Sequence, residues 1–461
     1  MLEEHELTGE WWLPGDPATH FGGTLSCKPG LRPRLRLAGS FVKLADFGRE
    51  FTPDVVLGRT AQAGPVALLH CRAAGGTRNL EQGGATESFL EAWALVAGLH
   101  CSQEDQVLLT KFTVELSHID EWADLFRISF TYPRQRKKTA PYEVTYVHPP
   151  PVEAALEDGA SLKIGVDIKG PQVSRPQRGI HVETTTVLTF EPASPISLSG
   201  ALKRLRVLGN LLCLATQERI FTLRLSAVAA EHPMTVAPDE GKIEILLFTP
   251  DIHEPERQLR PPHDMLFVLS DIADRLGPHL DRWFLAAEEI EEIFDLYFAT
   301  RNQPGMYLQH RFLSLTQALE GYHRLRMDKT EMPAEDHARR MEAVLSSAPA
   351  EYRPWLERVL EHSNEANLAT RLSDMCKEYR PIMNKVDRKR QWIDDAVRIR
   401  NYLSHGKSGE KPYDVPGLLG VTERLRILVE LGLMSELGFG LADLEGLVER
   451  YWRARPPLLA L

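Results

Sequence analysis

The stretch WIDDAVRIRNYLSHG (residues 392–406) decides the fold of the second half of the chain. At about 100° per residue, its apolar side chains cover one arc of about 160°, which predicts a helix with one face packed on a core. Arg400 falls inside this arc, between the directions of Ala396 and Ile393. Because an unpaired guanidinium on a packed face is costly, we expect Arg400 to contact a carboxylate, a phosphate or polar groups of a second subunit.

The helical period extends on both sides of this stretch. Leu308, Phe312, Leu315, Leu319 and Tyr322 form another apolar face. Further amphipathic runs cover residues 281–300, 334–347, 352–362, 367–379, 387–405, 417–433 and 441–452. Helices of this kind bury their apolar faces against one another, so we predict an all-α bundle over residues 261–461.

Before residue 250 the hydrophobic period is two instead. Leu35 and Leu37 alternate with Arg34 and Arg36, which is typical of a half-buried strand. The same alternation or apolar β-type runs occur at residues 126–130, 162–169, 182–190, 220–225 and 243–248. Residues 198–217 have helical spacing, and a Pro- and charge-rich link covers residues 250–262. The chain is therefore predicted to be an α+β multidomain protein, in which residues 1–260 form a mainly-β, sandwich-like domain with a packed helix.

Composition excludes several classes of protein. A formal net charge of -10 gives no global nucleic-acid signature, so any RNA contact must be local. The five cysteines form no CxxC pair, and no HExxH, GxSxG or phosphate-loop motif is present, so we expect neither a metal nor a cofactor. No apolar run approaches a membrane span and no signal segment opens the chain, which predicts a cytoplasmic protein without a membrane partner.

Basic residues concentrate around the opening stretch. Between Lys377 and Lys407 nine Lys or Arg stand against four acids, inside an acidic chain. Such a local excess is typical of phosphate binding, although a solvated charged face also produces it. The candidate RNA-binding residues are Lys385, Arg388, Lys389, Arg390, Arg398 and Lys407.

Arg400, Asn401 and His405 are the candidate catalytic residues. A guanidinium can hold a phosphate while an imidazole moves protons, which suffices to cut a phosphodiester without a metal. Asn401 and His405 are four residues apart and share one side of the helix, whereas Arg400 and His405 diverge by about 140°. Arg400 and His405 converge only if the helix frays at Gly406 or if two copies meet at a dimer axis. The alternative is that cations near a helix C-terminus merely suit its dipole.

Glu320 is the carboxylate that we nominate as the partner of Arg400. Its helix places Leu313, Thr316 and Glu320 beside the apolar face. The alternative is an ordinary ion pair with Arg324, four residues further on.

These residues carry a family resemblance. The segment 400–405 resembles the motif of HEPN ribonucleases, in which an Arg precedes a His by four to six residues and a polar Asn commonly follows the Arg. Residues 312–324 (FLSLTQALEGYHR) are similar to the preceding helix of the ApeA-like HEPN subgroup. The first half resembles the ApeA N-terminal domain through residues 9–14 (GEWWLP), 23–25 (GTL) and 116–122 (LSHIDEW).

The resemblance implies a metal-independent endoribonuclease that acts as the effector of bacterial anti-phage defence by abortive infection. It implies RNA as substrate, a homodimer whose two HEPN domains form one cleft, and a β domain that senses a trigger such as a phage protein. His405 would transfer protons, Arg400 would bind the scissile phosphate and Asn401 would orient either group. The alternative is a non-catalytic HEPN module that binds nucleotides or RNA, or only dimerises, beside a ligand-recognising β domain.

Overall fold

The computed structural model describes residues 4–28, 30–42, 50–77, 87–125, 128–131, 143–174, 179–230, 242–247, 260–327, 329–387, 391–405 and 411–458. By its internal contacts the chain forms two compact units, Met1–Asp281 and Arg282–Leu461, and each is considered by itself. The change of hydrophobic period predicts a boundary after residue 260, whereas the division between these units falls after Asp281.

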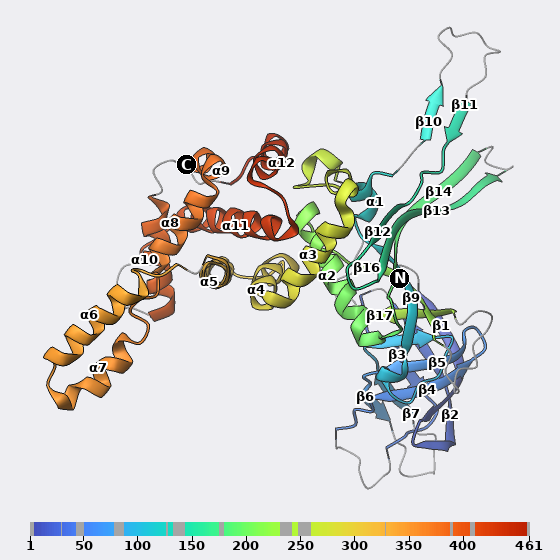
Figure 1. Cartoon of the computed structure of the whole chain (residues 1–461). Helices are drawn as coiled ribbons and strands as arrows, with labels where there is room; N and C mark the ends of the chain where they lie inside the picture. The colour runs from blue at the N-terminus through green and yellow to red at the C-terminus, as the bar shows by residue number, and fades with distance from the viewer. Residues whose placement is uncertain are drawn as a thin grey trace. The chain divides into compact units, whose positions relative to one another are not determined.

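The first unit is built on one large antiparallel sheet (Figure 1). Within the described residues its strands follow the order β12-β13-β14-β9-β16-β17-β8-β5-β4-β1-β2-β3-β7-β6, and β15 pairs with β9. Strands β10 and β11 form a separate two-stranded ribbon. The bounds are β1 His5–Leu13, β2 Asp16–Cys27, β3 Arg34–Leu37, β4 Val55–Thr60, β5 Gly64–Leu69, β6 Arg72–Thr77, β7 Glu87–Glu91, β8 Ala94–Ala97, β9 Leu108–Leu116, β10 Ile128–Thr131, β11 Glu143–Tyr146, β12 Val152–Ala155, β13 Ser161–Ser174, β14 Gly179–Glu191, β15 Ile196–Ser197, β16 Thr222–Ala229 and β17 Lys242–Leu247.

Alternation along these strands gives the sheet one apolar face. In β3 the two leucines are buried and the two arginines are exposed, as period two predicts. Trp11 of β1, Leu35 of β3 and Leu68 of β5 belong to one buried cluster although these strands are not neighbours in the sheet. The buried side chains of β1 to β8 thus form one continuous core on a face of the sheet.

Helix α2 (Leu198–Thr216) is the packed helix predicted from residues 198–217. Ser197 caps its first turn by accepting a hydrogen bond from the Gly200 amide at 3.1 Å, and its apolar face packs on β9. A short helix α1 (Ile119–Ala123) also lies in this unit. The amide of Leu266 donates to the Ala215 carbonyl at 2.8 Å, which ties the segment after residue 260 to α2 and explains why this unit extends to Asp281.

The second unit is helical throughout its described part (Figure 1). Its helices are α3 Leu276–Glu289, which begins in the first unit, α4 Glu291–Asn302, α5 Leu308–Arg326, α6 Ala334–Ser347, α7 Arg353–Leu360, α8 Leu368–Glu378, α9 Arg380–Val386, α10 Trp392–His405, α11 Val415–Leu437 and α12 Leu441–Ala454. Helix α11 begins at an Asp414 cap, ends at a left-handed Gly438 and packs against α5, α10 and α12. The Tyr322 hydroxyl of α5 donates to the Gly432 carbonyl of α11 at 3.3 Å, which fixes these two helices against each other.

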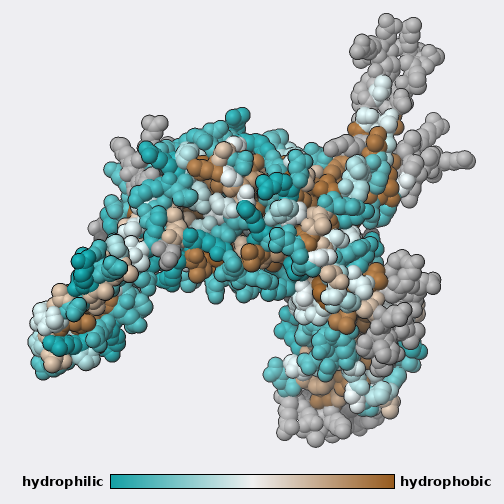
Figure 2. Space-filling view, viewed as in Figure 1, coloured by the Kyte–Doolittle hydropathy of each residue, from teal (hydrophilic) through white to brown (hydrophobic). Residues whose placement is uncertain are grey.

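Helices α6 and α7 form a hairpin that buries none of its residues. An antiparallel β-bridge between Thr330 and Glu365 joins the segments before α6 and after α7. Val344, Trp355 and Val359 are exposed on it, and Figure 2 shows hydrophobic surface among its polar residues.

The predicted fold class is confirmed: a large antiparallel β region with a packed helix precedes an all-helical region. All five cysteines are buried and none of them forms a disulfide bond, and burial raises the pKa of the Cys71 and Cys101 thiols to about 12. No helix in the described part of the chain combines the length and apolar character needed to cross a membrane. Within the same ranges, no three His, Cys, Asp or Glu side chains are grouped as a metal would require.

Candidate functional site

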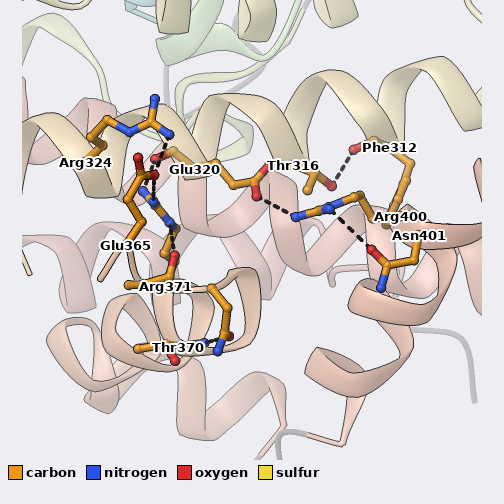
Figure 3. Close-up of polar contacts among 11 residues, drawn as sticks. Phe312, Thr316, Glu320, Arg324, Glu365, Thr370, Arg371, Arg400 and Asn401 are labelled. Carbon is orange, nitrogen blue, oxygen red and sulfur yellow. Dashed lines mark hydrogen bonds and ion pairs between the residues drawn. The ribbon is translucent and has the colours of Figure 1, made fainter. Parts of the chain in front are cut away.

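Arg400 of α10 forms an ion pair with Glu320 of α5 (Figure 3). Its Nη2 donates to the Glu320 Oε1 at 2.8 Å, and both side chains are 29% exposed. The nominated partner is therefore present, whereas Arg324 pairs with Glu365 instead. Arg400 lies beside the buried Ala396 and Ile399 of its own helix, as its position in the apolar arc predicts.

Asn401 completes the surroundings of this guanidinium. Arg400 Nη1 donates to the Asn401 Oδ1 at 3.2 Å, and the Arg400 Nε is buried without a hydrogen-bond partner among the described residues. Figure 3 shows the guanidinium held between α5 and α10 by these two contacts. The guanidinium is thus fixed in direction while part of it stays exposed, which leaves donors for an incoming anion.

His405 is the last residue of α10 and is exposed. It makes no hydrogen bond or ion pair with any other described residue. Because α10 remains helical through His405, the two side chains keep the divergence of about 140° that an ideal helix gives. A regular helix therefore directs the two side chains to different sides, and Gly406, where the helix was expected to fray, lies outside the described residues.

The basic residues near the motif are mostly engaged within the chain. Lys385 forms ion pairs with Glu445, at 2.7 Å, and with Glu449, and Arg398 pairs with Asp395 on its own helix. These contacts offset much of the local positive charge, so Lys385 and Arg398 are not free cations. The remaining candidates, Arg388, Lys389, Arg390 and Lys407, lie outside the described residues.

Arg371 of α8 also belongs to this site, although it was not among the predicted residues. Its side chain is 6% exposed and donates to the Glu320 carbonyl at 2.9 Å, to the Ala366 carbonyl at 2.7 Å and to the Glu365 carboxylate at 3.1 Å (Figure 3). The position of Arg371 on the helical wheel of α8 could have identified it from the sequence. Arg371 falls at the edge of the apolar arc of α8, about 40° from Met375 and about 60° from Leu368, whereas Arg400 lies inside the arc of α10.

The titratable groups around Arg371 have shifted pKa values. Burial disfavours the charged form of Glu365, but the nearby Arg324 and His362 together with Arg371 hold its pKa below the ordinary value. Burial lowers the pKa of His323, which is completely enclosed and 3.6 Å from Asp374. The lowered pKa favours the neutral imidazole of His323, and its complete enclosure keeps it away from any substrate.

Comparison with known families agrees with this architecture. Residues 6–283 match the ApeA N-terminal domain 1 family, and residues 313–442 match the Apea-like HEPN family. The second matched segment contains Glu320, Arg371, Arg400 and His405. No curated protein and no solved structure matches the chain significantly. Because the first match alone covers more than half of the 461 residues, the chain belongs to the ApeA family, with an ApeA N-terminal domain 1 followed by an Apea-like HEPN domain.

Proposed function

We propose that this protein is a metal-independent endoribonuclease whose HEPN domain cuts RNA in the cytoplasm. The observation that carries the proposal is the placement of Arg400. Its guanidinium lies on a packed helix face, is oriented by Glu320 and Asn401, and keeps an exposed portion. A directed, partly desolvated guanidinium is suited to hold a phosphate and to stabilise the charge that develops on it.

The reaction follows from the residue types. An imidazole exchanges protons near neutral pH, so His405 removes the proton of a ribose 2′-OH or protonates the departing 5′-oxygen, and water exchanges the other of these two protons. The 2′-oxygen then bonds to phosphorus as the bond from phosphorus to the 5′-oxygen breaks. The products are a 2′,3′-cyclic phosphate and a 5′-hydroxyl, and DNA is not cut because it lacks the 2′-OH.

Two copies of the chain are part of this proposal. Arg400 and His405 diverge on a regular helix, so an imidazole from a second copy is the simplest way to complete the site. A homodimer through the HEPN domain also agrees with the exposure of His405 at the end of α10.

The β domain is proposed to act as a sensor or regulator in anti-phage defence by abortive infection. A ribonuclease that acts on cellular RNA must be held inactive until infection. We propose that the β domain keeps the two motifs misaligned until a trigger, such as a phage protein, binds to it.

The experiment is incubation of the purified protein with labelled total RNA in EDTA, with and without phage proteins co-expressed as triggers. Cleavage by the wild type and its loss in His405→Ala, with unchanged thermal unfolding, support the proposal. Cleavage that persists in His405→Ala removes this site from the mechanism.

The second candidate is a HEPN module that binds RNA or nucleotides, or only dimerises, without cutting. The ion pairs of Lys385 and Arg398 favour the form that only dimerises, because they occupy cations that an RNA strand would use for binding as well as for cleavage. RNA binding or dimerisation by a protein that never cleaves, even with a trigger that relieves restraint, would support this candidate.

A further inference from the structure

A second network of charges lies inside the helical unit, on α11. Arg426 donates through Nε to the Glu423 Oε2 at 2.9 Å and through Nη2 to the Glu423 Oε1 at 2.5 Å, and its Nη1 contacts the Glu430 Oε1. The Tyr297 hydroxyl also donates to that Glu430 oxygen at 2.8 Å, and the Leu458 backbone donates to Glu423. Both carboxylates of the network are therefore already occupied by donors.

Arg311 of α5 lies at the edge of this network. On the helical wheel it is within about 40° of Leu315 and about 20° of Tyr322, so it projects from the face of α5 that packs on α11. Tyr322 of α5 contacts Gly432 of α11, and Arg326 of α5 contacts Glu436 of α11. The partners are 110 positions apart in the sequence in both contacts, so the two helices run parallel with a constant offset. The same register places Arg311 at the level of Val421, which is two residues before Glu423.

Arg311 has no partner for its charge in the described part of the chain. Its Nε is enclosed without a hydrogen bond, and its guanidinium forms no ion pair there. Burial and, after it, the nearby Arg301 lower the pKa of Arg311, while Glu423 acts in the opposite sense. Because the oxygens of Glu423 already hold Arg426, the half-buried guanidinium of Arg311 is left without an anion among the described residues.

We propose that Arg311 is the main ligand of a phosphate-binding site at the α5–α11 interface, separate from the Arg400 site. The planar guanidinium presents parallel donors that match phosphate oxygens, and a phosphate dianion also offsets the repulsion from Arg301 and Arg426. Glu320, nine residues further along α5, lies on the opposite side of the helix, since nine residues turn it by about 180°. The phosphate belongs either to a small molecule, such as a nucleotide, or to the end of an RNA strand.

Isothermal titration of the full-length protein tests this site without any cleavage reaction, so its result is independent of the proposed nuclease function. The probes are pyrophosphate, AMP, and a short RNA with either a 5′-phosphate or a 5′-hydroxyl, and citrate serves as the carboxylate control. The variants are Arg311→Ala and Arg311→Lys. Arg324→Ala is the matched control, because Arg324 lies on the same helix but is exposed and paired with Glu365.

We expect saturable binding of at least one phosphate probe, weakened about tenfold or more by Arg311→Ala and less by Arg311→Lys, and unchanged by Arg324→Ala. Preference for the 5′-phosphorylated RNA identifies RNA as the source, and equal or tighter binding of pyrophosphate or AMP identifies a small molecule. If Arg311→Ala fails to fold, the wild type and Arg311→Lys decide the outcome. No saturable binding by the wild type at millimolar phosphate, unaltered binding in the Arg311 variants, or equally tight citrate binding overturns the proposal.

Discussion

The ion pair between Glu320 and Arg400 has a coupling energy that can be measured. Exposed ion pairs contribute about 0 to 1 kcal/mol, whereas breaking a fully buried pair costs about 3 to 5 kcal/mol. Both side chains here are 29% exposed and 2.8 Å apart, so solvent screens the pair only in part. We expect a coupling energy of about 1 to 2 kcal/mol, between these two limits.

A double-mutant cycle with Glu320→Gln, Arg400→Gln and the double variant isolates this energy from chemical denaturation curves. In a unit of this size, Glu320→Gln alone should lower the midpoint of thermal unfolding by about 2 to 8 °C. The matched control is the cycle of Lys385→Gln and Glu445→Gln, a pair in which both side chains are 39% exposed. Its coupling should be at most about 0.5 kcal/mol and should vanish in 1 M salt.

A coupling below about 0.3 kcal/mol for Glu320 and Arg400 would be indistinguishable from simple additivity. That result would refute the reasoning that a packed helix face forces Arg400 to find an anion. It would also remove Glu320 as the group that orients the guanidinium.

Three further predictions follow from single residues. His405→Ala should reduce RNA cleavage by about 10² to 10⁴-fold without changing thermal unfolding, because the side chain is exposed; a large loss of stability would mean that its role is structural. Gly432→Ala should destabilise the helical unit by about 1 to 3 kcal/mol in urea unfolding, since a Cβ there would lie 3.1 Å from the Tyr322 ring; an unchanged midpoint would show that the ring moves freely. The pKa of His323 is lowered in the folded chain, so below the ordinary value of 6.5 the unfolded chain binds more protons. The free energy of unfolding should therefore decrease as the pH is lowered, by at most about 1.4 kcal/mol per pH unit. His323→Gln should flatten this slope, and an unchanged slope would assign it to other groups.

The helical wheel explains why the Arg400 contact could be predicted from the sequence. Helical periodicity fixes the direction of a side chain, and a guanidinium directed at a core must have a partner. The same criterion applies to Arg371 and Arg311, which also fall on buried faces, so both could have been found in this way. The proposed convergence of Arg400 and His405 is a different matter, because we propose that it needs a second copy of the chain, and periodicity does not describe contacts between copies.

The sheet shows where prediction from local pattern ends. Alternation in residues 34–37 identifies a strand, but it does not specify that this strand lies between β2 and β7. Pairings such as β17 with β8 join segments far apart in the chain, and no local property encodes them. The segment 262–275 consists of short 3₁₀ turns without a clear period, so the pattern does not indicate that residues up to Asp281 belong to the first unit.

The central claim is that Arg400 and His405 cut RNA through attack of a ribose 2′-OH without a metal. The most direct test is cleavage, in EDTA and with the activating trigger, of a labelled RNA and of the same strand with a single 2′-deoxyribose at the cleaved position. We predict a 2′,3′-cyclic phosphate product from the first strand, no cut at that position in the second, and no product from either strand with His405→Ala. Cleavage of the deoxy-substituted strand at that position, or an absolute requirement for a divalent metal, would contradict it.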